Sequence, residues 1–382
     1  MRDRMLGKTG MSVREVSLGC EHLQGKSEET VKAVIDAAID AGMNIFDVFM
    51  SEPNVRTYIG RALAGRRDRV ILQGHIGSCW VDGQYAVRRE YDLCKSNFED
   101  LLARLQTDYI DIGMLHFVDH MDDWEALRDS DTMRYALELK QKGAIRAIGM
   151  SSHNPVTARE AVESGLIEVL MFSLNPAFDL MPKDVEIMDL FEGKGNVFGE
   201  YRLEPARAAL YRACETHGVG ITVMKALGAG ALLSQARSPL GAPLTVGQCI
   251  NYALTRPAAA SVLVGMQTAW EVREAARYFD LTAKERDYAS ALAAMPRFGA
   301  NGRCMYCNHC LPCPSNIDIA AVNKYIDLVE LDKTPAASVK AHYRALGTTA
   351  GECISCGDCE ARCPFGVRVR ERMAVAEALF GA

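Results

Sequence analysis

The chain has 382 residues, of which 49% are hydrophobic and 24% charged, so it can form one large globular domain and one small one. Its formal net charge of −6 argues against nucleic acid or an anionic membrane as the main partner, because both require a basic face. No stretch reaches the roughly 18 uninterrupted apolar residues of a membrane span. The first residues also lack the apolar core of a signal peptide, so we expect a cytoplasmic protein.

Short apolar runs alternate with amphipathic helical stretches through the first 295 residues. The runs predict strands at 16–20, 44–49, 70–76, 109–116, 145–151, 169–174, 220–225 and 261–266. Helices such as 28–41 and 90–105 are expected between them. Apolar runs without alternation are typical of parallel strands buried on both faces. Eight strand-then-helix units therefore predict an α/β fold, a (β/α)8 TIM barrel over residues 1–295. The residues around 11–18 are expected to form a small hairpin that closes the bottom of this barrel.

Eight of the thirteen cysteines lie in two quartets between residues 304 and 363. Three cysteines at CxxCxxC spacing can bind three irons of a cubane, while a fourth, followed by proline, turns to the other cluster. We therefore predict two [4Fe–4S] clusters, one on Cys304, Cys307, Cys310 and Cys363, and the other on Cys353, Cys356, Cys359 and Cys313.

A pair of structural zinc sites is the alternative for these cysteines. Zinc usually takes two CxxC or CxxH pairs separated by a longer loop, and the consecutive triplets here do not follow that pattern. Between the quartets, residues 315–350 carry a helical pattern. Residues 296–382 are thus predicted to form a small helical ferredoxin-type domain that binds two [4Fe–4S] clusters.

Several stretches resemble the aldo/keto reductase superfamily, in the branch that carries a C-terminal ferredoxin domain. They are LGKTGMSV, AIDAGMNIFDV, LLARLQTDYIDIGMLH, IRAIGMSSHNP, ITVMKALGAG, CMYCNHCLPCPSNIDI and CISCGDCEARCPFGV. The resemblance spans essentially the whole chain. It implies a barrel that binds NAD(P)H at its mouth and reduces carbonyl or related groups.

The resemblance also implies a catalytic tetrad of Asp, Tyr, Lys and His. Asp47 matches the aspartate after the second strand, and His116 matches the histidine after the fourth. The tyrosine position holds Glu52 and the lysine position holds His75, so half of the tetrad is replaced. Carboxylate and imidazole groups both transfer protons, and these four residues form a candidate catalytic set.

The cofactor-contacting positions that the resemblance implies also differ from the family pattern. A Ser-Asn pair appears as Ser151 and Ser152, and the amide-binding glutamine position holds Met171. Lys225, Gly265 and Gln267 fall at the remaining candidate positions for the cofactor. NAD(P)H or a flavin therefore stays open as a source or acceptor of electrons.

The sequence favours an iron–sulfur oxidoreductase that acts on a small organic substrate at the barrel mouth. Two [4Fe–4S] clusters would relay electrons, and an external ferredoxin or another donor would supply them. One alternative is a redox-neutral lyase or isomerase in which Glu52, His75 and His116 transfer protons, with or without a divalent metal at the mouth, and the clusters are structural. Another is a non-enzymatic electron carrier or redox sensor. Replacement of the Tyr–Lys pair predicts little reduction of ordinary aldehydes by NADPH.

Overall fold

The structure is a computed structural model that describes residues 2–179, 204–294, 302, 304, 306–329 and 335–381. Its contacts divide the chain into two compact units. The first comprises Met1–Leu174, His217–Ala226 and Ala258–Leu281, and the second comprises Asn175–Thr216, Leu227–Pro257 and Thr282–Ala382. The expected domain boundary after residue 295 falls on residues outside the described part, so the division into 1–295 and 296–382 stays a prediction.

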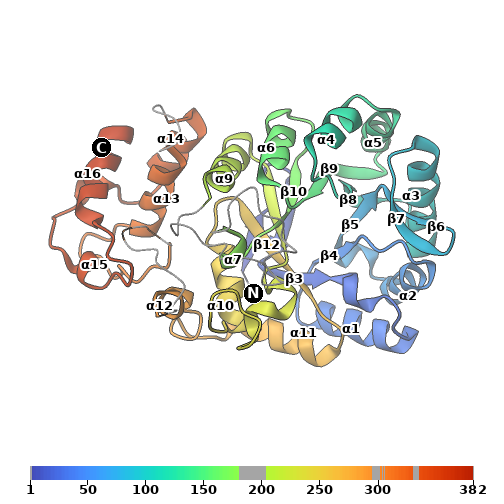
Figure 1. The fold of residues 1–382 in the computed structure, drawn as a ribbon, viewed down its shortest axis with the longest axis horizontal. Coiled ribbons are helices and arrows are strands. Elements are labelled where there is room, and N and C mark those ends of the chain that lie inside the picture. The colour runs from blue at the N-terminus through green and yellow to red at the C-terminus, as the bar shows by residue number, and fades with distance from the viewer. Residues whose placement is uncertain are drawn as a thin grey trace. The chain divides into compact units, whose positions relative to one another are not determined.

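The first unit contains a closed barrel of eight parallel strands, which confirms the predicted fold class (Figure 1). The strand order around the barrel is β10-β11-β12-β3-β4-β5-β8-β9. The strands are β3 (Val16–Gly19), β4 (Ile45–Val48), β5 (Ile71–Ile76), β8 (Ile110–Leu115), β9 (Ile145–Ser152), β10 (Val169–Ser173), β11 (Gly220–Met224) and β12 (Ala259–Gly265). Their residues are almost all buried, because the interior covers one face and the helices cover the other. This double burial explains the apolar runs in the sequence.

Helices follow the strands, and most begin at a residue that the sequence marks as a cap. Ser27 accepts a hydrogen bond from the backbone N–H of Thr30 at the start of one helix. Asn154 accepts one from the backbone N–H of Val156 at the start of another helix. The helices are α1 (Glu28–Asp40), α2 (Pro53–Leu63), α3 (Tyr91–Leu105), α4 (Met121–Arg128), α5 (Asp131–Gln141), α6 (Pro155–Glu163) and α11 (Ala269–Ala276). Short 3₁₀ turns occur at η1 (Cys20–Leu23), η2 (Arg67–Arg69) and η4 (Arg277–Phe279).

An N-terminal hairpin packs into the apolar interior of the barrel. It consists of antiparallel strands β1 (Asp3–Met5) and β2 (Ser12–Arg14), so it begins earlier in the chain than the hairpin expected around residues 11–18, and Val16–Gly19 belongs to the barrel. Its residues Leu6, Met11 and Val13 belong to one buried cluster with residues from strands β4, β8, β9, β10 and β12. Gly7 has a positive φ of 52°, and a Cβ there would lie 2.3 Å from the Gly218 carbonyl oxygen. The hairpin can approach β11 this closely only with glycine at that position.

A second hairpin, which the sequence analysis did not predict, follows the third barrel strand. Strands β6 (Ser78–Val81) and β7 (Gln84–Val87) are antiparallel and joined by Asp82 and Gly83. Both turn residues have positive φ, 51° and 77°, as a two-residue type I′ hairpin requires. This hairpin carries a residue of the candidate site described below.

The second unit is built from helices and short turns over its described residues. Its elements are α7 (Pro176–Asp179), α9 (Pro205–His217), η3 (Gly228–Leu233), α10 (Val246–Leu254), α12 (Tyr288–Ala293), α13 (Ile319–Val329), α14 (Ala337–Arg344), η5 (Ala350–Glu352), α15 (Asp358–Ala361) and α16 (Val369–Phe380). Helices α13 and α16 pack against each other, and Arg372 on α16 binds the side chains of Asn323 and Asp327 on α13. The helical pattern expected within 315–350 is confirmed by α13 and α14.

No helix in the part of the chain that the structure describes combines the length and the apolar character that crossing a membrane requires.

Candidate functional site

Three neighbouring barrel strands bring an aspartate and two histidines together. Asp47 lies in β4, His75 lies in β5, and His116 directly follows β8. The strands β4, β5 and β8 are consecutive neighbours in the barrel, and they are parallel, so their carboxyl ends meet at the same mouth. The tertiary structure therefore collects three of the four residues of the predicted catalytic set.

These side chains form a continuous row of hydrogen bonds with a tyrosine from the second hairpin. Asp47 Oδ1 lies 2.9 Å from His75 Nε2, and the Nδ1 atoms of His75 and His116 are 2.7 Å apart. His116 Nε2 lies 2.6 Å from the hydroxyl oxygen of Tyr85, which is on β7. We call Asp47, His75, His116 and Tyr85 the mouth network. Gln73 supports it by donating from Nε2 to Asp47 Oδ1 at 2.9 Å.

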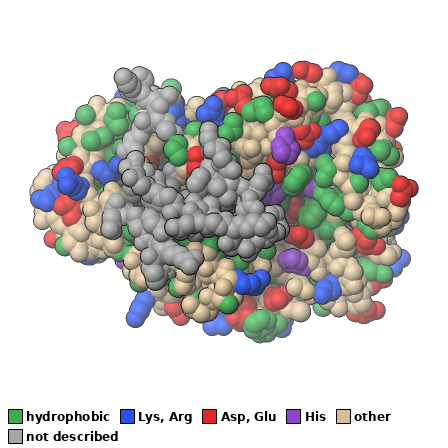
Figure 2. Space-filling view, viewed as in Figure 1, with side chains coloured by type: hydrophobic (Ala, Val, Ile, Leu, Met, Phe, Trp, Pro, Cys, Tyr) green, Lys and Arg blue, Asp and Glu red, His purple; other side chains and the backbone are tan. Residues whose placement is uncertain are grey.

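Aromatic rings enclose the mouth network. The Phe49 ring stacks on His116 with centroids 5.6 Å apart and an interplanar angle of 11°, and its edge faces His75 at 6.0 Å. Phe49 also meets Tyr85 edge to face at 6.2 Å. Figure 2 shows histidine side chains gathered near the middle of the visible face, among acidic and hydrophobic ones. The apolar walls lower the local polarity, which strengthens hydrogen bonds between the four residues.

Burial separates the members of the mouth network into an inner and an outer part. Asp47 and His75 are each 2% exposed and His116 is 5% exposed, whereas Tyr85 is 42% exposed. Burial, followed by the neighbouring His75, holds the pKa of His116 well below its usual range, so this imidazole is neutral near pH 7. Burial also raises the pKa of the Tyr85 phenol. Tyr85 therefore keeps its proton at neutral pH.

When Asp47 is a carboxylate and both imidazoles are neutral, the direction of every hydrogen bond in the row is fixed. A carboxylate only accepts, so His75 donates from Nε2 and its Nδ1 is an acceptor. His116 then donates from Nδ1 to His75, and its Nε2 accepts from the Tyr85 hydroxyl. Each member passes one hydrogen toward Asp47. Such a row can move a proton between its two ends without building charge on the imidazoles at either end state.

Glu52, the fourth residue of the predicted catalytic set, lies outside the mouth network. Its carboxylate caps α2 by accepting from the backbone N–H groups of Asn54 at 3.0 Å and Val55 at 2.7 Å. This is the usual position and partner set of an acidic N-cap residue. Tyr85 belongs to no motif in the sequence. The signal that could have located it is the Asp82–Gly83 dipeptide, which favours a tight hairpin and places Tyr85 two residues beyond the turn.

The two serines proposed for the cofactor have hydrogen-bond partners inside the barrel unit. Ser151 is buried, and its hydroxyl oxygen accepts from the Phe117 backbone N–H at 2.8 Å. Ser152 is fully buried and donates to Asp119 Oδ1 at 3.1 Å. These hydroxyls fix the loop after β8 against the end of β9, which is a role within the fold.

The remaining cofactor positions are also occupied by intramolecular contacts. Lys225 pairs with Glu21 at 3.5 Å, and a Cβ on Gly265 would lie 2.7 Å from the His22 ring. After β12, the Glu271 carboxylate accepts from the backbone N–H groups of Gln267 and Thr268 at the start of α11. A carboxylate at this helix start repels the phosphate that a nicotinamide nucleotide would bring. NAD(P)H binding at these positions stays a prediction from the family resemblance.

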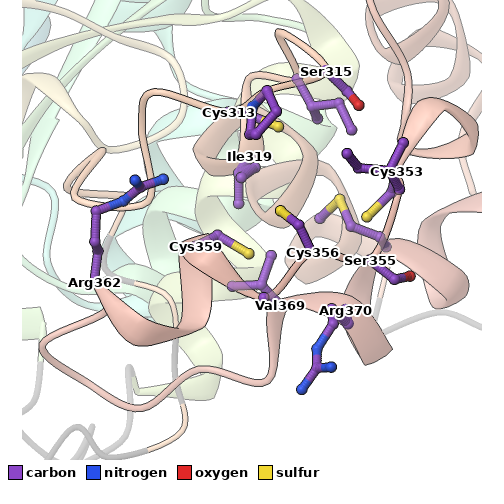
Figure 3. Close-up of a pocket in the computed structure, with 15 residues that line it drawn as sticks. Cys313, Ser315, Ile319, Cys353, Ser355, Cys356, Cys359, Arg362, Val369 and Arg370 are labelled. Atoms are coloured by element: carbon purple, nitrogen blue, oxygen red, sulfur yellow. The ribbon is translucent and has the colours of Figure 1, made fainter.

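Four of the predicted cluster cysteines line one cavity in the second unit. Cys313 from the first quartet and Cys353, Cys356 and Cys359 from the second line the same pocket (Figure 3). Its other walls are mostly apolar, and they include Ile317, Ile319, Ile354, Val369 and Met373. A ring of four thiols around a largely apolar space fits the ligands of a [4Fe–4S] cluster. Cys313 thus lies with the second triplet, where the sequence analysis placed it.

The other four cysteines interact with one another electrostatically. Burial, followed by the neighbouring Cys307, raises the pKa of the Cys310 thiol to about 12, with smaller contributions from Cys359 and Cys363. Burial likewise raises the pKa of Cys304, with smaller contributions from Asp327, Cys307 and Cys310. Thiols that oppose one another's ionisation in a buried site are suited to iron ions, whose positive charge would stabilise all four thiolates. This set fits the first predicted cluster.

Sites for a single metal ion are a separate question from the iron–sulfur clusters. Within the described residues, no group of three or more His, Cys, Asp or Glu side chains is placed to hold a metal ion. The nitrogen and oxygen atoms of Asp47, His75 and His116 hydrogen-bond to one another. The zinc alternative for the cysteines and the divalent metal at the mouth both stay predictions.

The chain also matches known proteins over both parts. Residues 15–243 match the model of the aldo/keto reductase family, and residues 303–368 match that of a 4Fe-4S dicluster domain. Two relatives from Bacillus subtilis are the uncharacterized oxidoreductase YqkF, 33% identical over 195 residues, and the aldo-keto reductase YhdN, 26% identical over 200 residues. The matches cover 48% and 50% of this chain and only 59% and 58% of those relatives.

A solved structure agrees with the barrel fold. The holo form of aldo-keto reductase AKR11C1 from Bacillus halodurans superposes with a TM-score of 0.58 and 24% identity. The superposition covers 76% of this chain and 96% of that one. At this identity the likeness concerns the fold alone. Because the family model spans more than half of the chain, the protein belongs to the aldo/keto reductase family, and it carries a C-terminal 4Fe-4S dicluster domain.

Proposed function

We propose that the protein is an iron–sulfur oxidoreductase that reduces a small carbonyl-type or quinone-type substrate at the barrel mouth. The mouth network is the observation that carries this proposal, because it joins a buried carboxylate to a solvent-accessible phenol through two imidazoles. A proton row that ends at the hydroxyl of a partly exposed tyrosine suits the protonation of a substrate oxygen. Family membership supports the oxidoreductase class.

The electron source in this proposal is the C-terminal 4Fe-4S dicluster domain. When bound, two [4Fe–4S] clusters would supply electrons one at a time from a low-potential donor such as an external ferredoxin. Reduction of a carbonyl to an alcohol takes two electrons and two protons. The mouth network would deliver the proton that binds to oxygen, and solvent water would supply the proton that binds to carbon. The contacts at the nucleotide positions favour the clusters over NAD(P)H as the electron source. Glu271 binds the backbone N–H of Gln267 and Glu21 pairs with Lys225, and these are the groups that would meet the phosphates of NAD(P)H.

Removal of one cluster ligand tests the relay. We expect Cys356→Ala to lower the iron content from about eight to about four per chain, and to abolish turnover driven by dithionite-reduced methyl viologen. Turnover would be followed as viologen oxidation with a panel of small aldehydes, ketones and quinones. Cys249→Ala is the matched control, since Cys249 is a buried cysteine of α10 outside both quartets. Equal viologen-driven turnover in wild type and Cys356→Ala would refute electron relay and favour a redox-neutral reaction.

A second measurement addresses the nicotinamide. With NADPH and the same aldehydes, we expect steady-state turnover at least about 10²-fold below the viologen-driven rate, because the side chains at the nucleotide positions have other partners. Titration of NADPH fluorescence against the protein provides the binding readout. Fast NADPH oxidation by simple aldehydes, together with tight NADPH binding, would show that the barrel works with hydride transfer instead.

A further inference from the structure

The outer end of the mouth network identifies a further residue for the proposed reaction. We propose that Tyr85 is the catalytic residue that exchanges a proton with the substrate, and that His116, His75 and Asp47 supply this proton from behind it. The inference rests on the proposed function, since it assumes that a substrate is protonated at the barrel mouth. It assigns a role to a residue of the β6–β7 hairpin, outside the barrel strands.

Tyr85 is the one member of the network that both solvent and a substrate can reach. Its side chain is 42% exposed, while the three groups behind it are at most 5% exposed. Any proton that enters or leaves His116 through this network therefore passes the Tyr85 hydroxyl, which lies 2.6 Å from His116 Nε2. That separation is within the range for proton transfer along a hydrogen bond.

The network has two end states with opposite hydrogen-bond directions. In the unloaded state, Asp47 is a carboxylate and the hydroxyl of Tyr85 points toward His116. In the loaded state, one added proton rests on Asp47, which donates to His75 Nε2, and His75 Nδ1 donates to His116 Nδ1. His116 Nε2 then donates to the Tyr85 oxygen, so the phenolic hydrogen points into the mouth. Both imidazoles are neutral in both states.

Delivery of the proton converts the loaded state into the unloaded state. The Tyr85 O–H bond breaks as a new O–H bond forms on the substrate oxyanion produced by reduction. Tyr85 receives the hydrogen of His116 Nε2, His116 receives that of His75 Nδ1, and His75 receives that of Asp47. One proton has moved from Asp47 to the substrate, and no electron has moved in this step. Solvent reloads the network through Tyr85 after the product leaves.

The pKa shifts of His116 and Tyr85 agree with this cycle. Burial lowers the pKa of His116, so this imidazole does not hold a second proton and stays neutral. Burial raises the pKa of Tyr85, so the phenol carries its proton at neutral pH. The Phe49 ring holds the His116 ring by stacking, which keeps Nε2 directed at the hydroxyl.

The purely structural alternative is that the Tyr85 hydrogen bond only anchors the hairpin. In that case Tyr85→Phe would change stability and leave the proton chemistry intact. The experiment therefore needs a readout that anchoring alone does not move. The solvent isotope effect on kcat and the pH dependence of kcat are two such readouts, because both report proton transfer in the reaction.

The test compares Tyr85→Phe with Tyr91→Phe in the cluster-loaded, full-length protein. Tyr91 is a partly exposed tyrosine of α3 that packs on Tyr135 and lies outside the mouth network. With reduced methyl viologen and the most active compound of the panel, we expect Tyr85→Phe to lower kcat by about 10²–10⁴-fold, with KM within about threefold of wild type. Tyr91→Phe should retain the wild-type rate.

A second variant protects the test against misfolding. Incorporation of a fluorotyrosine at position 85 keeps the ring and hydroxyl but lowers the phenol pKa. We expect its basic limb of the kcat–pH profile to shift to lower pH, while an anchoring hydroxyl would leave the profile unchanged.

The possible outcomes separate the two proposals. Wild-type kcat in Tyr85→Phe, with loss of turnover in Cys356→Ala and in His75→Gln, overturns the role of Tyr85 and leaves the proposed function standing. Wild-type turnover in all three variants overturns the proposed function. A large loss in Tyr85→Phe, together with the shifted profile of the fluorotyrosine protein, supports Tyr85 as the proton donor.

Discussion

His75→Gln is expected to lower viologen-driven turnover by about 10²–10⁴-fold while the protein stays folded. Glutamine can reproduce both hydrogen bonds of His75, because its amide oxygen can accept from His116 Nδ1 and its amide nitrogen can donate to Asp47. An amide does not gain or lose a proton near neutral pH. The substitution therefore keeps the connections of the mouth network and interrupts only proton movement through it.

The matched control for this variant is His153→Gln. His153 also forms a histidine–carboxylate pair, with Nδ1 3.0 Å from Asp119 Oδ2, and it lies just after β9 outside the mouth network. We expect its turnover to stay within about threefold of wild type. Thermal unfolding of both variants, followed by circular dichroism, checks that they fold. A His75→Gln protein with wild-type turnover would show that protons reach the substrate by another route.

Arg56→Met is expected to lower the free energy of unfolding by about 3–5 kcal/mol. The Arg56 guanidinium is fully buried and donates to the carbonyl oxygens of Met50 at 2.8 Å, Asn97 at 3.0 Å and Ser78 at 3.4 Å. Burial lowers the pKa of this group to about 10, so it stays charged at neutral pH. Methionine would fill much of the space but leave three carbonyl groups without this donor, in surroundings that water reaches poorly.

The control for this prediction lies on the same helix. Arg61 is exposed and makes a surface ion pair with Glu28 at 2.8 Å. Arg61→Met should change the free energy of unfolding by at most about 1 kcal/mol, because exposed ion pairs contribute little. Urea unfolding of both variants measures the difference. Equal stability of Arg56→Met and Arg61→Met would mean that the buried guanidinium gains no net free energy from its partners.

Arg56 also links the scaffold to the site. It joins the chain after β4, the start of β6 and helix α3, and β6 pairs with the strand that carries Tyr85. Replacement of the Arg56 guanidinium would therefore weaken the packing of the β6–β7 hairpin as well as that of helix α3. For this reason the Arg56 variants are measured by unfolding, and the assignment of Tyr85 rests on its own variants.

The sequence predicted the barrel because its signal is local and repeated. Each strand is an apolar run bounded by a turn, and burial on both faces requires such a run wherever the strand lies in the barrel. The cysteine quartets predicted the two clusters equally well, because a [4Fe–4S] cluster takes three of its ligands from a short stretch of chain. The presence of Cys313 beside Cys353, Cys356 and Cys359 follows the same logic across a longer separation.

Tyr85 and Glu52 mark the limit of that reasoning. Glu52 occupies the expected position along the sequence, yet its carboxylate is closer to the free N–H groups of its own helix than to the mouth network. Tyr85 is far from any matched motif and reaches His116 only because the Asp82–Gly83 turn folds β7 back along β6. Side-chain partners across 31 residues depend on three-dimensional proximity, which spacing along the chain does not encode.

The local patterns of the sequence predicted the (β/α)8 barrel and the ferredoxin-type tail, and the family resemblance pointed to three members of the mouth network. The tertiary structure decided how these residues connect. It paired the two imidazoles through their Nδ1 atoms, assigned Glu52 to a helix cap and brought Tyr85 from a hairpin to the exposed end of the network. A proton can pass only between atoms within hydrogen-bond distance, and the packing of distant segments sets that distance.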